Sequence, residues 1–180
     1  MRRFLLPLFA LACLALPASA GAQTLSARGA NGAQVAVEAA DGEKGVQLTI
    51  TAGNREPQVF DGVGDALVPL RAGGRSGPIL AIDVDRDGVD EIFVRTSSQN
   101  RTGILIVFRW DAMTEQYTPV SFTEDTGTPR PYLLVHLSQP VSVNGNVVEA
   151  NNDSTDGARK RLRVLRYQWN GRGFDYSGSN

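Results

Sequence analysis

The sequence contains few of the residues that usually cross-link a fold or carry out catalysis. Its 180 residues include one cysteine and one histidine. The cysteine, Cys13, lies in an apolar N-terminal stretch, so the remainder of the chain can form no internal disulfide. The histidine, His136, has no second histidine or nearby cysteine to accompany it, which leaves a zinc site of the usual kind without ligands. Any bound metal must therefore be held by oxygen atoms.

A long apolar run is also missing. The longest one, FLLPLFALACLALP, is interrupted by prolines and is shorter than the ~20 residues that a membrane-spanning helix needs. Two arginines precede it, and a tripeptide of small residues that ends at Ala20 follows it. This order is typical of a secretory signal peptide over residues 1–20, cleaved near Ala20. We therefore expect a periplasmic or secreted protein without stable membrane insertion.

The sequence has no strong excess of either charge. It has 18 basic and 19 acidic residues, and two of the basic ones lie in the signal peptide, so residues 21–180 carry 16 − 19 = −3. A chain with this weak negative charge offers no general attraction to nucleic acid or to anionic membranes. We expect neither as a partner.

Helical periodicity is absent as well. No stretch of 11 or more residues after the signal has a 3.6-residue apolar period, whereas short runs rich in Val, Ile, Leu, Phe and Tyr recur between Gly, Asn, Asp and Pro. The predicted strands lie near 33–39, 46–52, 57–60, 66–71, 79–84, 91–98, 103–110, 117–122, 132–137, 146–150, 161–169 and 173–176. The pattern predicts an all-β protein, an antiparallel meander of four-stranded blade-like units in a small or irregular propeller-like fold, with a β-sandwich as the alternative.

A weak internal repeat supports blade-like units. The tetrapeptide FRWD, which contains Trp110, is echoed 59 residues later by YQWN, which contains Trp169. Each follows an apolar strand and precedes a turn and an aromatic strand, so both are interpreted as one type of hairpin. The expected organisation is a flexible N-terminus over 21–32 and one β-domain over 33–178, in units of about 33–71, 79–122 and 132–178.

The segment DVDRDGVDE, residues 83–91, carries the clearest chemical signal. Alternating acids in a tight loop direct their oxygens toward one centre, and an all-oxygen site suits Ca²⁺. Gly88 permits the sharp turn, and the carbonyl of Val89 can point inward. Asp90 falls between the ligand positions and is expected to face solvent. Unneutralised, carboxylates ~4 Å apart repel by roughly 4 kcal/mol per pair at an effective dielectric constant near 20.

This loop resembles the calcium loops of integrin-α-type FG-GAP and VCBS-like β-repeats, whose pattern is D-x-D-x-D-G-x-x-[DE]. The resemblance covers about a dozen residues and implies a calcium site between two strands. It implies these ligands: the side chains of Asp83, Asp85, Asp87 and Glu91, and the carbonyl of Val89.

The sequence gives little support for an enzyme. His136 and Ser138 share one face of a predicted strand, but no nucleophile motif such as G-x-S-x-G accompanies them. We therefore expect a binding protein without catalytic residues.

A second resemblance suggests what is bound. Bacterial periplasmic inhibitors of lysozyme-like enzymes, including immunity proteins against peptidoglycan hydrolases, are similar: they combine a signal sequence, a compact propeller-like β-domain and an integrin-like acidic loop. That resemblance implies a protein partner, a candidate peptidoglycan hydrolase, contacted by the polar loops 96–102, 124–131 and 151–158. The candidate contact residues are Ser98, Asn100, Arg101, Asp125, Arg130, Asn152 and Asp153.

The alternative is a carbohydrate-binding or cell-surface-binding module with a purely structural calcium site. It would use Trp110 and Trp169, because tryptophan rings stack on sugars. Packing in the core is the competing role for both rings, since they occupy the same place in a repeated hairpin.

Overall fold

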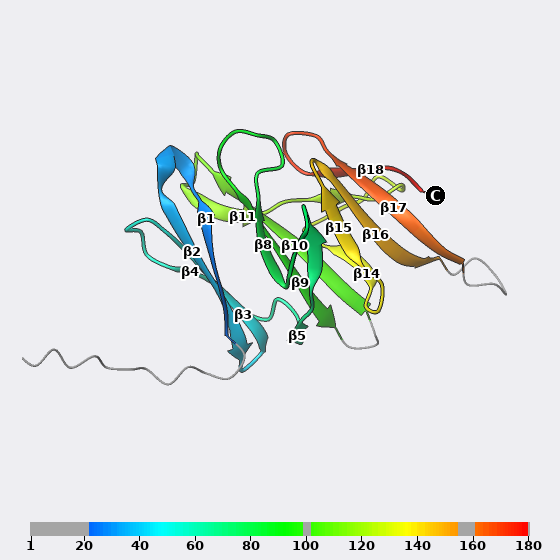
Figure 1. The fold of residues 1–180 in the computed structure, drawn as a ribbon, viewed down its shortest axis with the longest axis horizontal. Helices are drawn as coiled ribbons and strands as arrows, with labels where there is room; N and C mark the ends of the chain where they lie inside the picture. Colours follow the sequence, from blue (N-terminus) through cyan, green and yellow to red (C-terminus); the bar gives the residue numbers. More distant parts are fainter. Residues whose placement is uncertain (1–21, 99–101, 155–160, 180) are drawn as a thin grey trace, which may run out of the picture.

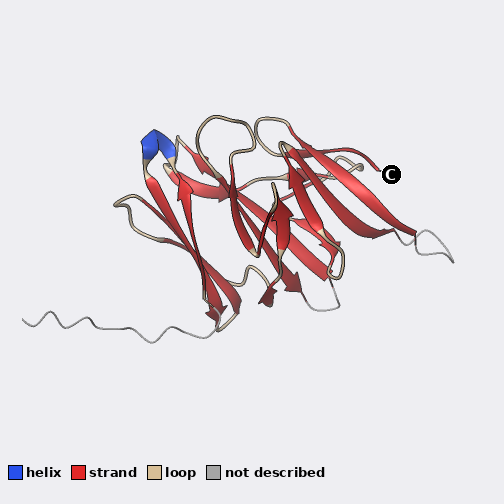
Figure 2. Ribbon diagram, in the orientation of Figure 1, coloured by secondary structure: helices blue, strands red, loops and turns tan. Residues whose placement is uncertain are grey.

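The protein is built from three β-sheets that lie side by side. The computed structural model describes residues 22–98, 102–154 and 161–179, and contains no α-helix among them. Figure 1 shows the first sheet on the left, the second in the middle and the third on the right, and Figure 2 shows that strands dominate the fold. The predicted all-β class is confirmed. None of the three sheets is closed.

The first sheet has four antiparallel strands in sequence order. They are β1 (Gln23–Arg28), β2 (Gln34–Gly42), β3 (Gly45–Ala52) and β4 (Gln58–Phe60), with a short 3-10 turn, η1 (Ala30–Gly32), between β1 and β2. The expectation of a flexible segment over 21–32 is wrong, because β1 pairs with β2 along its whole length. Leu25 and Ala27 of β1 turn toward the apolar core.

The second sheet occupies the middle of the molecule. Its strands are β5 (Ala66–Leu67), β8 (Ile79–Ile82), β9 (Glu91–Ser98), β10 (Thr102–Asp111), β11 (Gln116–Pro119) and β14 (Leu133–His136). The long strands β9 and β10 pair over seven residues at its centre. The predicted strands at 91–98 and 103–110 are therefore confirmed.

The third sheet has eight strands. They are β6 (Leu70–Ala72), β7 (Arg75–Gly77), β12 (Phe122–Thr123), β13 (Pro129–Arg130), β15 (Val141–Asn144), β16 (Val147–Ser154), β17 (Arg161–Trp169) and β18 (Phe174–Ser179). Most neighbours are antiparallel, but β12 with β18 and β15 with β6 are parallel. These parallel pairs join segments that are distant in sequence.

Two apolar cores separate the three sheets. One core packs the first sheet against the second, and the other packs the second against the third. The second sheet is thus buried on both faces, which explains the three successive apolar residues IFV in β9. Ile92 and Val94 point into the first core, whereas Phe93 points into the second. Side chains alternate across a strand, so a doubly buried strand needs apolar residues at successive positions.

The sheets do not coincide with the three consecutive units expected from the sequence. The segment 66–72 gives β5 to the second sheet and β6 to the third. Similarly, β14 joins the second sheet although it lies in the expected unit 132–178. The chain therefore crosses between sheets where the sequence predicts a simple meander.

Both predicted tryptophan hairpins are present. Trp110 in β10 lies opposite Tyr117 in β11, and Trp169 in β17 lies opposite Phe174 in β18. The ring centroids are 5.5 Å apart in the first pair and 5.0 Å apart in the second, and both pairs are edge-to-face. The repeat in the sequence therefore corresponds to a repeated local structure.

Candidate metal centre

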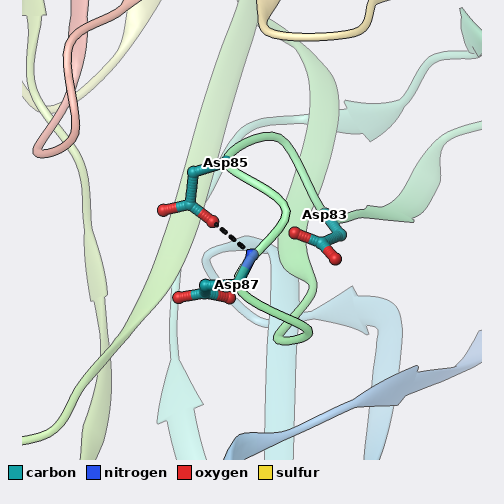
Figure 3. Close-up of side chains that lie close together, drawn as sticks. All are labelled: Asp83, Asp85 and Asp87. Carbon is teal, nitrogen blue, oxygen red and sulfur yellow. Dashed lines mark hydrogen bonds between the residues drawn. The ribbon is translucent and has the colours of Figure 1, made fainter.

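The acidic segment forms the loop between β8 and β9. Its turn is made by Arg86 and Gly88, whose φ angles of 64° and 91° lie in the left-handed region. The turn places one carboxylate oxygen from each of Asp83, Asp85 and Asp87 within 4.8 Å of the others. Figure 3 shows the three side chains gathered around this loop. These three residues could hold a metal ion.

Backbone amides of the loop donate hydrogen bonds to these carboxylates. The Asp87 N–H donates to Asp85 Oδ1 (3.3 Å), and the Val89 N–H donates to Asp87 Oδ1 (2.8 Å). The Gly88 N–H donates to Asp83 Oδ2 (3.2 Å). Among the described residues, however, Asp83 Oδ1 is buried and accepts no hydrogen bond. A buried anionic oxygen without a donor is costly, and a cation held by the three carboxylates would remove that cost.

Glu91 lies beside the three aspartates, at the start of β9, and is only 1% exposed. Its Oε2 accepts a hydrogen bond from the Val84 N–H (3.0 Å). The pKa of Glu91 is raised to about 7, mainly by burial; the Val84 N–H opposes this rise, the carboxylates of Asp85 and Asp87 add to it, and Arg109 opposes it. A positive ion at the loop would favour the ionised form. The structure leaves Glu91 outside the group that converges within 4.8 Å.

Asp90 does not face solvent as expected. It is 8% exposed, and it binds Arg28 of the first sheet. The Arg28 N–H donates to Asp90 Oδ2 (2.7 Å), and Arg28 Nη2 donates to Asp90 Oδ1 (2.7 Å). Arg28 Nη2 also contacts Asp83 Oδ2 at 3.2 Å. The acidic loop is therefore linked directly to β1.

Arg109 of β10 links the same loop to the third sheet. Its Nη2 lies 3.4 Å from Asp85 Oδ2, and its Nε lies 3.9 Å from Glu91 Oε1. Its Nη1 donates to the carbonyl of Gly171, in the β17–β18 turn, at 2.7 Å. The guanidinium also lies over the ring of Trp169, 5.4 Å from its centroid. All three sheets thus meet at the acidic loop.

The residues of the loop fit a metal ion that prefers oxygen ligands. The converging atoms are carboxylate oxygens, which suit Ca²⁺ or Mg²⁺ and do not suit the softer metals. Val89, the expected carbonyl ligand, lies at the end of the loop with its N–H bonded to Asp87. Metal binding by the Val89 carbonyl and by the Glu91 side chain stays a prediction.

The expected partner-binding residues fall in separate regions. Asp125 is exposed on the turn between β12 and β13, and Arg130 lies in β13, where its Nη1 is 3.7 Å from Glu124 Oε1. Ser98 ends β9, so it lies seven residues, or roughly 23 Å, from the acidic loop at the other end of that strand. Asn100 and Arg101 lie outside the described residues. Asn152 and Asp153 belong to β16, but their side chains lie outside the described part.

A buried arginine, Arg95, is not among the residues expected from the sequence. Arg95 is 3% exposed in β9 and donates to the carbonyls of Pro69 (2.6 Å), Leu137 (2.9 Å) and Gln139 (2.8 Å). Burial lowers its pKa. These bonds fix the turn after β14 against the second sheet. The available signal was a single charged residue inside the apolar run IFVRT.

His136 and Ser138 do meet after β14. Ser138 Oγ lies 3.0 Å from His136 Nδ1 on an exposed part of the turn. This contact matches their expected common face.

Comparisons with known proteins identify no relative: no family model, curated protein or solved structure matches the chain. In the part of the chain that the structure describes, no helix has the length and apolar character needed to span a membrane. The site therefore has to be interpreted from its own geometry.

Proposed function

We propose that the protein is a calcium-binding β-protein that acts by binding another macromolecule. The observation that carries the calcium site is the buried, unpaired Oδ1 of Asp83 beside the carboxylates of Asp85 and Asp87. Calcium is favoured over magnesium because it accepts irregular sets of six to eight oxygens, whereas magnesium demands near-ideal octahedral geometry. In this proposal Val89 and Glu91 complete the ligand set, as the resemblance to the FG-GAP and VCBS-like loops implies.

The ion would act mainly as a structural link. Arg28 and Arg109 bring the first and third sheets to the loop, and each contacts one of the candidate ligands. A divalent ion at the centre would fix the carboxylates that these arginines bind. It would serve a domain that has no disulfide after Cys13. We regard the three sheets as blade-like units of a propeller-like arrangement that the ion stabilises.

The binding partner in this proposal is a protein outside the cytoplasm. The signal-like N-terminus supports export to the periplasm or beyond, and the net charge of −3 for residues 21–180 gives no support for nucleic acid. The resemblance to periplasmic lysozyme inhibitors makes a peptidoglycan hydrolase the candidate. Such a protein inhibits the enzyme by occupying its substrate cleft and needs no catalytic residues of its own.

Calcium binding is tested by isothermal titration of CaCl₂ into chelator-treated protein. We expect one ion per chain, with a dissociation constant of ~10⁻⁴–10⁻³ M or tighter, as for extracellular calcium modules. The variant Asp85→Asn/Asp87→Asn is expected to lose the binding heat, whereas the control Asp41→Asn/Asp125→Asn keeps it because both acids are exposed and lie outside the group of converging carboxylates. Equal heats from the two variants would refute the site.

The inhibitor function is tested with a panel of lysozyme-like peptidoglycan hydrolases. We expect stoichiometric protein to abolish the activity of at least one enzyme, and the double variant Asp125→Ala/Arg130→Ala to weaken this inhibition. The control Arg172→Ala changes another exposed arginine on a different turn. Full activity of every enzyme at saturating protein would contradict the inhibitor function without affecting the calcium site.

A further inference from the structure

A cleft opens between the first and second sheets beside the acidic loop. Its volume is 690 Å³. Four segments line it: the β1–β2 connection, the β3–β4 turn, the acidic loop and the β10–β11 turn. A volume of this size falls within the range of small-molecule sites, which is roughly 300–1,000 Å³.

The cleft has an aromatic wall. Trp110 lines it and also lines a second hollow of 210 Å³ on the β3–β4 side. Arg55 lies over the Trp110 ring, 5.3 Å from its centroid, and its Nη1 contacts Glu115 Oε2 at 2.7 Å. Both charged side chains are about half exposed, at 48% and 59%. The Arg55–Glu115 pair and the indole therefore stand between the two hollows.

The remaining polar groups of the cleft are mixed in kind. Asn31 and Asn54 are exposed amides that can donate and accept, and Asp87 is an acceptor. With Arg55, Glu115 and Asp87, the formal charge of the lining without a bound ion is −1, which disfavours phosphates and other anions. The polar lining equally disfavours a lipid chain.

Unusual backbone conformations gather at the same place. Among the described residues, the non-glycine residues with a positive φ are Asn31, Arg86 and Glu115. Asn31 and Glu115 line the cleft, and Arg86 directly precedes Asp87, which also lines it. Residues in this region cost energy and concentrate at functional sites.

We propose that this cleft is a binding site for a neutral oligosaccharide. A sugar presents hydroxyl groups that both donate and accept, together with an apolar ring face. The cleft supplies the matching partners: donors and acceptors from Asn31, Asn54 and the Arg55–Glu115 pair, around the half-buried ring of Trp110. Trp169 takes no part, because it is buried in the core between the second and third sheets. This site is a function beyond the proposed protein binding and does not depend on the hydrolase.

The two tryptophans of the chain allow a direct test. The variant Trp169→Phe leaves Trp110 as the only indole, and Trp110→Phe leaves Trp169. Each is titrated with cello-, malto- and N-acetylchito-oligosaccharides up to millimolar concentration, in CaCl₂ and again in chelator, because Asp87 also belongs to the metal loop. We expect at least one series to give a saturable change in Trp110 emission and no change in Trp169 emission.

Further variants test whether the change in Trp110 emission comes from binding in the cleft. Arg55→Ala is expected to weaken the binding at least tenfold, whereas Arg172→Ala leaves it unchanged. If Trp169→Phe does not fold, the two indole N–H signals of the unaltered chain provide the readout in an NMR titration, with the Trp110 signal moving alone. No response of Trp110 to any of the three series, or an affinity unaffected by Arg55→Ala, would overturn the proposal.

Discussion

The two tryptophan hairpins follow one plan but serve different parts of the molecule. In β10–β11 and in β17–β18, the tryptophan meets an aromatic ring edge-to-face across the strand pair. In both, an arginine from outside the hairpin lies over the indole: Arg55 of the β3–β4 turn over Trp110 at 5.3 Å, and Arg109 of β10 over Trp169 at 5.4 Å. The local sequence therefore specifies the hairpin and its aromatic pair, whereas the arginine of each stack comes from a distant segment.

The difference lies in the surroundings of each stack. Trp169 is 7% exposed in the core between the second and third sheets, and its arginine reaches the acidic loop. Trp110 is half-buried beside the cleft, and its arginine pairs with an exposed glutamate. One hairpin closes a core, whereas the other leaves its tryptophan half-buried in the wall of the cleft. Packing by other sheets, and not the hairpin itself, decides which role each ring takes.

The largest expected difference between the hairpins is in stability. Trp169→Ala should lower the free energy of unfolding by about 3–5 kcal/mol, because it empties a buried core position. Trp110→Ala should cost only about 1–2 kcal/mol, because water can enter the space that the half-buried ring leaves. Urea unfolding of both variants measures the difference. Equal losses would show that the two rings are buried alike.

The glutamates beside the two arginines should respond to pH in opposite ways. The pKa of Glu115 is lowered, first by its hydrogen bond with Arg55, so its contribution to stability is lost as pH falls. The pKa of Glu91 is raised from its usual 4.5 to about 7. Protonated Glu91 is therefore more stable in the folded protein than in the unfolded chain. As pH rises from 4.5 to about 7, the folded protein should lose stability by an amount on the order of 3 kcal/mol.

This pH effect should depend on calcium. In chelator, thermal unfolding should show a midpoint that falls between about pH 5 and pH 7, and Glu91→Gln should remove most of the fall. In millimolar CaCl₂ the fall should be smaller, because the ion favours ionised Glu91. A midpoint in chelator that stays constant over this range would contradict the assigned environment of Glu91.

The arginines give the smallest expected effects. Arg109→Gln should destabilise the ion-free protein by about 1 kcal/mol, because it removes contacts with Asp85, Glu91 and the Gly171 carbonyl. It should also tighten calcium binding several-fold in a calorimetric titration, because a competing positive charge leaves the site. Arg55→Gln, at an exposed pair in which Arg55 contacts Glu115 and none of the three carboxylates, should change stability by less than about 1 kcal/mol and leave calcium affinity unaltered. Identical calcium affinities for the two variants would argue against an influence of Arg109 on the site.

Local patterns predicted the features that depend on local sequence. The strands at 91–98 and 103–110, the tryptophan hairpins and the clustered carboxylates of the acidic loop all follow from periodicity or spacing within one segment. β1 was missed because QTLSAR directs only Leu25 and Ala27 inward, which makes no clear apolar pattern. The strand is held instead by pairing with β2 and by Arg28, whose partner Asp90 lies 62 residues away.

Long-range contacts account for the other differences between the predicted and the observed structure. Asp90 was expected in solvent because nothing near it in sequence marks Arg28 as its partner. Arg95 is buried because carbonyls 26 to 44 residues away surround it. The division of 66–72 between two sheets depends on the parallel pairing of β6 with β15, which no local pattern specifies. Each case is a contact between distant segments, whereas the sequence patterns report only on neighbours.

We propose that an ion held by the acidic loop stabilises the junction of the three sheets. The most direct test compares the thermal midpoint of the protein in EDTA and in millimolar CaCl₂, with Asp85→Ala/Asp87→Ala as the control. Calcium at 100 times its dissociation constant should add about 2.7 kcal/mol, which corresponds to several degrees for a domain of this size. We expect this shift in the unaltered protein and none in the variant. Identical midpoints in EDTA and calcium for the unaltered protein would contradict the claim.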